Sequence, residues 1–302
     1  MKYLVTGGLG FIGSAVVRFL AKNTKNDIYV IDKWGYASDP RNLSETPNVK
    51  FCRVDLTNAQ LTAKIVADVN PDYIMHLAAE SHVDNSIASP SVFINSNIVG
   101  TFNLLEAVRL MGDKSNLKMF HHISTDYVFD GNVAGTEDSK TNPLNIYGYS
   151  KQLGETLVQT VCPTALIIRT ASVYSEFGHN FLKTMLERYN GGQKEFNVVC
   201  DHLSCPTYAP DLAETIFKLV KDGVNSKIVH YAGADYISWY DFARKIFLVI
   251  DLSVTVNPVS ASTYNSKAVR PATSYLKTDP TLNPRSVDSG IVRTLTILLN
   301  KE

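Results

Sequence analysis

The sequence predicts a doubly wound α/β fold, in which helices cover both faces of a parallel β-sheet. Short runs rich in Val and Ile alternate with helical patterns over residues 1–174. These runs lack the alternation of a half-exposed strand, so each strand should be buried on both faces. A glycine-rich turn follows the first run. The alternation of strand-like runs with helical patterns ends after Tyr174. We therefore expect one large domain followed by a smaller region.

The large domain is expected to contain six strands and four helices. The strands are predicted at residues 2–7, 27–34, 49–56, 72–79, 119–129 and 164–174. The helices are predicted at residues 13–23, 59–69, 90–112 and 147–161. A ligand of this fold binds beyond the C-terminal ends of the strands, so the candidate site residues should lie there.

Residues 175–302 are expected to form mainly a substrate-binding region, a partly discontinuous cap on the first domain. A loop and helix are predicted over 176–192 and a further helix over 238–250. Between them, a helix at 211–223 and a strand at 227–233 should return to the main sheet. Elements near 206–233 are therefore assigned to the first domain.

Composition narrows the choice of partners. The 302 residues include 29 Lys and Arg against 29 Asp and Glu, and no basic tract stands out. Nucleic acid or an anionic membrane surface is therefore not expected as the main partner. The chain enters a strand at once, and no apolar run is long enough to span a bilayer, so we expect a cytoplasmic protein. The four cysteines have no zinc-binding spacing, and no metal is expected.

The segment TGGLGFIG carries the fingerprint of a dinucleotide site. Gly7, Gly10 and Gly13 lie between a strand and a helix, and Asp32 ends the next strand about 20 residues later. Glycines allow pyrophosphate to approach the amides at a helix N-terminus, and the carboxylate can hold the ribose hydroxyls of NAD. The positive charge of Lys33 could partly offset the repulsion between the Asp32 carboxylate and a 2′-phosphate. The alternative is a glycine turn that binds no nucleotide. The residues expected to contact NADPH or NADH are Gly7, Gly10, Phe11, Ile12, Gly13, Asp32, Lys33, Asp55, Leu56, Ala78, Ala79, Tyr147 and Lys151.

The segment YGYSK places Tyr147 and Lys151 four residues apart on one helix face. A neighbouring ammonium and the positively charged nicotinamide favour the phenolate and should bring the pKa of the phenol closer to working pH. Such a pair can deliver a proton to a ketone oxygen while hydride reaches the carbon. Thr125 ends the fifth predicted strand and could steady the carbonyl. Tyr149 has no lysine four residues later, so it is not expected to take this role.

This combination resembles the extended short-chain dehydrogenase/reductase family, and the resemblance extends over nearly the whole chain. The N-terminal third is similar to nucleotide-sugar 4,6-dehydratases in LVTGGLGFIGSAVVRFL, HLAAESHVDNSI and NIVGTFNLLEA. The remaining two-thirds is similar to dTDP-4-dehydrorhamnose reductases in STDYVFDG, NPLNIYGYSKQLGE, LIIRTASVYSEFGHNFLKTML, CPTYAPDLAE, HYAGADYISWYDFA and AVRPATSYL. The second set decides the implied function, because it holds the reacting end of the substrate.

The resemblance implies reduction of the C4 ketone of a nucleotide-linked 4-keto-6-deoxy sugar in deoxysugar biosynthesis, by a homodimer that uses NADPH or NADH. Tyr147 would be the proton donor, Lys151 its partner and Thr125 the hydrogen-bond partner of the carbonyl. The residues expected to bind the sugar or its phosphates are Ser81, His82, Asp126, Tyr127, Asn180 and Arg270. For His82 and Arg270, an ordinary loop or surface position is the alternative.

The chain departs from the reductase pattern at three positions. Ser172 replaces a tryptophan that contacts the sugar in such reductases, and His202 and Ser204 alter the segment that precedes Pro206. A UDP-linked or 2-acetamido sugar therefore stays open beside the dTDP-linked one.

Two other functions stay open at this stage. A 4,6-dehydratase is supported by the N-terminal third, but it needs an Asp–Glu pair where this chain has Asp126 and Tyr127. A non-catalytic regulatory subunit of the methionine adenosyltransferase type would share the fold. Such a subunit would have no need of Thr125, Tyr147 and Lys151.

Overall fold

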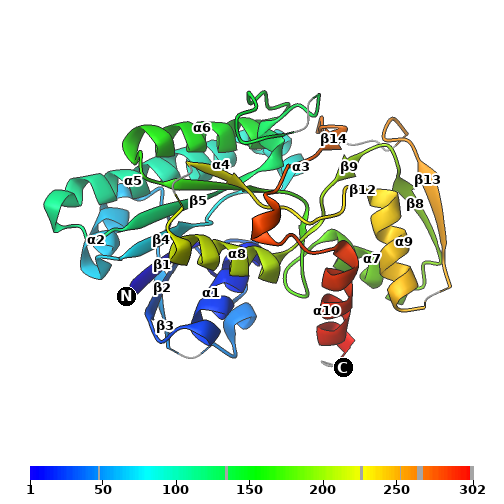
Figure 1. Cartoon of the computed structure of the whole chain (residues 1–302), viewed down its shortest axis with the longest axis horizontal. Helices are drawn as coiled ribbons and strands as arrows, with labels where there is room; N and C mark the ends of the chain where they lie inside the picture. Colours follow the sequence, from blue (N-terminus) through cyan, green and yellow to red (C-terminus); the bar gives the residue numbers. More distant parts are fainter. Residues whose placement is uncertain (47, 133–134, 225–226, 252, 264–267, 300–302) are drawn as a thin grey trace.

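The computed structural model describes residues 1–299 except 47, 133–134, 225–226, 252 and 264–267. A sheet of seven parallel strands forms the centre of the fold. Figure 1 shows this sheet between layers of helices. The strand order is β11 (Ile228–His230), β6 (Leu166–Thr170), β5 (Met119–Thr125), β4 (Tyr73–His76), β1 (Lys2–Thr6), β2 (Asp27–Asp32) and β3 (Val49–Arg53). The doubly wound α/β fold predicted from the sequence is confirmed.

Helices cover both faces of the sheet. One face packs against α1 (Phe11–Asn23) and α8 (Ala209–Asp222). The other packs against α2 (Ala59–Val69), α5 (Gly100–Met111) and α6 (Ile146–Val161). Each layer has its own buried aliphatic cluster, because the inner strands of the sheet are apolar on both faces, whereas the edge strand β3 is partly exposed. Because the strands are parallel, their carboxyl ends lie along one edge of the sheet, where a ligand of this fold binds.

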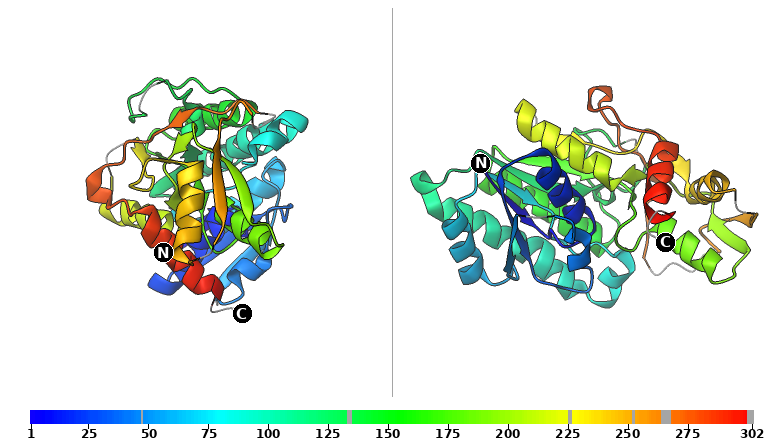
Figure 2. Two further views of the ribbon diagram at one scale, coloured as in Figure 1. Left: turned by 90° about the vertical axis from the view of Figure 1, so that its right-hand side faces the viewer. Right: turned by 90° about the horizontal axis from the view of Figure 1, so that it is seen from below.

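The rest of the chain gathers at one end of the sheet, on the right of Figure 1 and of the right-hand view in Figure 2. Its helices are α7 (Phe181–Asn190), α9 (Trp239–Val249) and α10 (Val287–Leu299). Its strand groups are β13 (Thr255–Val259) with β8 (Glu195–Val199), β10 (Thr207–Tyr208) with β7 (Val173–Tyr174), and β12 (Ile237–Ser238) with β9 (Leu203–Ser204) and β14 (Thr273–Ser274). An aromatic-rich third cluster forms the core of this region. A domain boundary at residue 174 stays a prediction.

The structure refines three predicted elements. The strand predicted at 119–129 ends at Thr125, and a short 3-10 turn, η4 (Asp126–Val128), follows it. The strand predicted at 164–174 is divided into β6 and β7 at Ser172, whose φ of 42° lies in the left-handed region. The helix predicted at 90–112 contains a π-helical stretch (Ile94–Val99) between α4 (Pro90–Phe93) and α5. Pairing of β8 with β13 and helix α10 were not predicted.

Candidate active site

A cleft of about 480 Å³ opens at the carboxyl edge of the sheet and extends to α7 and α9. Every residue expected to bind cofactor or to catalyse lines this one cleft. Five of the six residues expected to bind substrate line it as well: Ser81, His82, Asp126, Tyr127 and Asn180. Arg270 instead lines a small adjoining recess, which shares Tyr127, Ser172 and Trp239 with the cleft.

The glycine turn between β1 and α1 needs glycine at two positions. Gly7 has φ +67°, and a Cβ there would lie 2.7 Å from the Cα atom of Ala78. A Cβ at Gly13 would overlap the carbonyl oxygen of Gly7. The absence of these side chains leaves backbone facing the cleft at the start of α1, where unpaired N–H groups favour an anion. This cradle fits the pyrophosphate of a dinucleotide.

Asp32 ends β2 with its carboxylate held by the neighbouring loop. Its Oδ2 atom accepts the backbone N–H of Leu9 at 3.0 Å. Its Oδ1 atom accepts the Trp34 N–H at 2.8 Å and the Ser38 hydroxyl at 2.6 Å. A carboxylate has about four lone-pair sites, so capacity remains for a ribose hydroxyl. Ser38 was not predicted, because no local pattern marks a serine six residues from Asp32.

Lys33 does not stand free beside Asp32. Its Nζ atom lies 2.6 Å from the Oε1 atom of Glu80 and 3.1 Å from the Ser96 hydroxyl. Because Glu80 neutralises this ammonium, Lys33 offers less attraction to a 2′-phosphate than its position in the sequence suggests. Ser96 lies on the π-helical stretch and lines the cleft, and it too was missed.

Tyr147 is placed by the way α6 begins. Asn145 caps this helix, because its Oδ1 atom accepts the N–H of Gly148 at 2.9 Å. A Cβ at Gly148 would overlap the carbonyl oxygen of Tyr127, so only glycine allows α6 to approach η4 this closely. The Tyr147 ring then lies edge-on to the Tyr127 ring, with centroids 5.8 Å apart. The Thr125 hydroxyl hydrogen-bonds the phenol.

The phenol of Tyr147 is held in its protonated form. Burial raises the pKa of Tyr147 to about 12; the hydrogen bond with Thr125 lowers it, and the negative charge of Asp126 raises it. The lowering expected from the neighbouring ammonium is not seen in the ligand-free protein, where burial has the largest effect because removing a phenolate from water is costly. The effect of the positively charged nicotinamide stays a prediction. A protonated phenol suits a proton donor.

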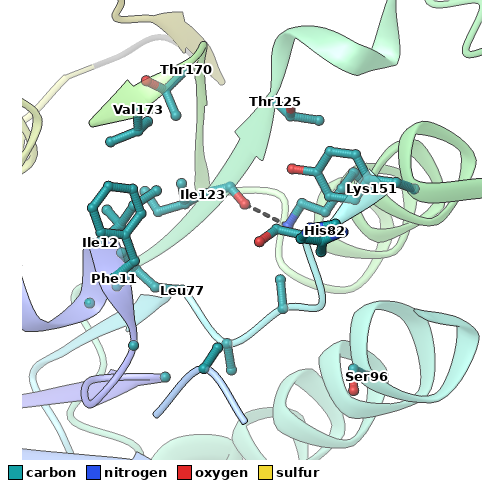
Figure 3. A pocket seen from close by; sticks show the side chains of 18 of the residues that line it. Phe11, Ile12, Leu77, His82, Ser96, Ile123, Thr125, Lys151, Thr170 and Val173 are labelled. Atoms are coloured by element: carbon teal, nitrogen blue, oxygen red, sulfur yellow. Dashed lines mark hydrogen bonds between the residues drawn. The ribbon is translucent and has the colours of Figure 1, made fainter. Parts of the chain in front are cut away.

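Lys151 is buried under the same cleft. Its Nζ atom donates to the carbonyl oxygen of Ile123 at 2.6 Å, the dashed line in Figure 3. Burial lowers the pKa of Lys151 to about 8. One residue earlier, the Ser150 hydroxyl accepts a hydrogen bond from Asn97, whose side chain also bonds both backbone groups of Glu80. Asn97 thus ties the loop after β4 to helix α6.

The predicted substrate residues differ in how freely they face the cleft. Ser81 and His82 are exposed at its rim. Asn180 uses its side chain to cap α7 and to hold the carbonyl of Ser175, 2.8 Å away. Arg270 lies 2.8 Å from a carboxylate oxygen of Asp84 and hydrogen-bonds the phenol of Tyr127. Substrate contact by these residues stays a prediction.

Two further cleft residues come from the region beyond β6. Ser172 lines the cleft in its left-handed conformation, and its hydroxyl contacts that of Ser204. Trp239, the first residue of α9, forms part of the far wall and packs against Phe181 with the two rings tilted and their centroids 4.8 Å apart. Trp239 was not predicted to line the site, because helix α9 shows only the ordinary apolar pattern of a buried helix.

The histidines of β5 bear on metal binding. His121 and His122 are both buried, and they point to opposite faces of the sheet as neighbours on a strand must. Among the described residues, no group of three or more His, Cys, Asp or Glu side chains could hold a metal ion. No helix among the residues that the structure describes is long and apolar enough to cross a membrane.

Comparison with known proteins places this architecture in a family. The family described as the RmlD substrate binding domain matches residues 1–287. The chain belongs to this family. It is 32% identical over 288 residues to a dTDP-4-dehydrorhamnose reductase of Aggregatibacter actinomycetemcomitans, covering 91% of this chain and 90% of that protein. It is also 33% identical over 284 residues to a dTDP-glucose 4,6-dehydratase of Neisseria meningitidis serogroup B, covering 87% and 79%.

A solved structure from the same family agrees with the fold. The dTDP-4-dehydrorhamnose reductase of Bacillus anthracis, in complex with NADP, superposes with a TM-score of 0.84 at 30% sequence identity. The match covers 98% of this chain and 99% of that chain. The predicted resemblance to the reductases, with dehydratase-like relatives beside them, is therefore confirmed.

Proposed function

We propose that this protein reduces the C4 ketone of a nucleotide-linked 4-keto-6-deoxy sugar, with NADPH or NADH as reductant. One observation carries the proposal: Thr125, Tyr147 and Lys151 meet in the cleft that also contains the glycine turn and Asp32. The family and the NADP complex of a relative support the same activity.

The glycine turn and Asp32 would hold the pyrophosphate and ribose of the dinucleotide. A reduced nicotinamide bound there would supply hydride to the carbonyl carbon. Tyr147 then gives its phenolic proton to the carbonyl oxygen, which Thr125 holds by a hydrogen bond. Lys151 offsets the negative charge left on the phenol, and solvent later returns the proton. The products are the sugar alcohol and the oxidised dinucleotide.

The assay should separate the substrate alternatives. Purified protein is offered dTDP- and UDP-linked 4-keto-6-deoxy sugars, each with and without a 2-acetamido group, and cofactor absorbance is followed. Turnover of one or more sugars, lost in Tyr147→Phe, supports the proposal. Turnover of the dTDP-linked deoxyhexose alone would remove the UDP and 2-acetamido alternatives. Oxidation with none of the four would contradict the proposed activity.

Dehydratase activity is the second candidate, because relatives with that name match most of the chain. Elimination needs an acid and a base beside the tyrosine, and Tyr127 stands where the base would be. A dehydratase would retain NAD⁺ through purification and would consume no net cofactor. Mass spectrometry of the supernatant after denaturation, with product analysis, separates the two activities.

A homodimer is the assembly that we propose for this chain, by resemblance to its family. Size-exclusion chromatography with light scattering measures the mass directly. A mass near the 33.4 kDa of one chain would contradict a dimer.

A further inference from the structure

Glu80, in the loop after β4, is a buried carboxylate that pairs with a lysine of the cleft. It is 6% exposed, and its Oε1 atom lies 2.6 Å from the Nζ atom of Lys33. The side chain of Asn97 bonds the backbone N–H of Glu80 at 2.8 Å and its carbonyl at 2.9 Å. Asn97 is in turn bonded to Ser150 of α6 at 2.8 Å. The backbone of Glu80 is therefore fixed, and its carboxylate is shielded from water.

This pairing limits what Lys33 can do. A buried carboxylate without a partner is strongly unfavourable, so Lys33 cannot leave Glu80 without a large cost in free energy. An ammonium has three protons, of which the Glu80 carboxylate and the Ser96 hydroxyl accept two. The third proton stays available to a ligand, but the positive charge is already neutralised. Lys33 can thus donate a hydrogen bond in the cleft without supplying net attraction for a phosphate.

The charges around the end of β2 then add up to a negative site. The carboxylates of Asp32 and Glu80 outnumber the ammonium of Lys33. Lys33 and Lys151 are the only lysines or arginines among the described residues that line the cleft, and Lys151 lies at its reacting end. Arg53, on β3, instead packs over an aromatic ring outside the lining. A ribose hydroxyl can donate to Asp32, whereas a 2′-phosphate, with about two negative charges at neutral pH, is repelled.

We infer that Glu80 is a specificity-determining residue: by neutralising Lys33, it makes the site favour NAD(H) over NADP(H). The inference rests on the dinucleotide binding that the proposed reductase function includes. It deepens that function by naming NADH as the preferred electron donor and Glu80 as a cause of the preference. Binding alone can test it, without any sugar.

The direct test is the binding of NADH and of NADPH to the ligand-free protein, followed by fluorescence titration. Wild-type protein should bind NADH about tenfold more tightly than NADPH. Glu80→Gln keeps an acceptor for Lys33 but removes the negative charge. It should bind NADPH about tenfold more tightly than wild type does, with NADH binding nearly unchanged. Glu106→Gln is the control, because it removes an equal charge from an exposed ion pair with Arg109 on α5, and both affinities should stay at the wild-type values.

A double variant tests whether the effect of Glu80 depends on Lys33. Lys33→Met combined with Glu80→Gln removes one charge of each sign and leaves no buried carboxylate unpaired. Its preference for NADH should return to that of wild type, because the net charge of the site is the same. If the double variant kept the tighter NADPH binding of Glu80→Gln, the dependence on Lys33 would be wrong.

Wild-type protein supplies a second measurement that requires no variant to fold. Salt screens repulsion between charges, so the ratio of the Kd for NADPH to the Kd for NADH should fall between about 0.05 M and about 0.5 M NaCl. A ratio that does not fall would overturn the inference, as would unchanged NADPH binding in Glu80→Gln. Binding of neither dinucleotide would overturn both the inference and the proposed function. A preference for NADH without turnover of any sugar would contradict only the proposed function.

Discussion

The Nζ atom of Lys151 lies 2.6 Å from the carbonyl oxygen of Ile123. This hydrogen bond joins helix α6 to β5, two residues before Thr125. The ammonium is thereby held beneath the cleft at a fixed position, although no sequence pattern relates a lysine to that carbonyl. A buried lysine of this kind is costly to the stability of the fold, because its charge is removed from water.

Lys151→Met should weaken catalysis and stabilise the protein at pH 7. Burial lowers the folded-state pKa to about 8 from the usual 10.5. The unfolded chain therefore binds more protons between these values, and wild-type stability rises with pH across that window. At pH 7 the buried charge is present, and its removal should add about 1 kcal/mol to the free energy of unfolding. Urea unfolding at pH 7 and pH 10 measures this, with the exposed Lys64→Met as control. If Lys151→Met raised the free energy of unfolding as much at pH 10 as at pH 7, the buried charge would not be the cause.

Tyr147→Phe should lower kcat about 1,000-fold, because the proton donor is lost while the ring is kept. Tyr149→Phe is a matched control two residues away. The Tyr149 ring is 48% exposed and has no lysine one turn later, so its loss should leave kcat unchanged. Steady-state rates of cofactor oxidation compare the two variants. Equal losses in both would show that the helix, and not the phenol, is affected.

Thr125→Val should lower kcat about 100-fold, since a donor to the developing oxyanion is removed at nearly constant volume. Binding of NADPH, followed by fluorescence titration, should be unchanged. Thr160→Val on the exposed side of α6 removes a hydroxyl that bonds only within its helix, and it should behave as wild type. Wild-type turnover in Thr125→Val would show that the carbonyl is held elsewhere.

Asp32→Asn should raise the ratio of kcat/KM for NADPH to that for NADH by about tenfold. The carboxylate repels a 2′-phosphate, and Lys33 is engaged by Glu80 and cannot fully offset it. In the Asp32→Asn variant, the side-chain amide oxygen can still accept one hydrogen bond from the loop. Asp39→Asn, at a partly exposed position in the same loop region, is the control. The prediction fails if Asp32→Asn and wild-type protein have the same ratio of kcat/KM for NADPH to that for NADH within error.

Stability should fall steeply as pH drops from about 6.5 to 4. Burial lowers the pKa of His76 to about 3, and of His121 and His230 to about 4. These folded values lie below the usual 6.5, so the unfolded chain binds more protons in that range and stability is lost on acidification. Each group contributes up to about 1.4 kcal/mol per pH unit. Urea midpoints at pH 7 and 5 test this. His121→Leu should reduce the slope, whereas replacing the exposed His82 by Gln should not.

The sequence by itself determined the parallel sheet, the glycine turn with Asp32, and the pairing of Tyr147 with Lys151. Each depends on local order: strands and helices repeat with fixed periods, and residues four apart on a helix must share a face. The boundaries were less exact, as where Ser172 divides a predicted strand in two.

Only the tertiary structure decided what surrounds those residues. Ser274 reaches Asp126 across 148 positions of the chain, and Arg270 meets Asp84 across 186. Burial then raises the pKa of Tyr147 above its ordinary value and lowers the pKa of Lys151 below its own. Such contacts leave no periodic trace in the sequence, because they arise when separate elements pack together and water is excluded from the space between them.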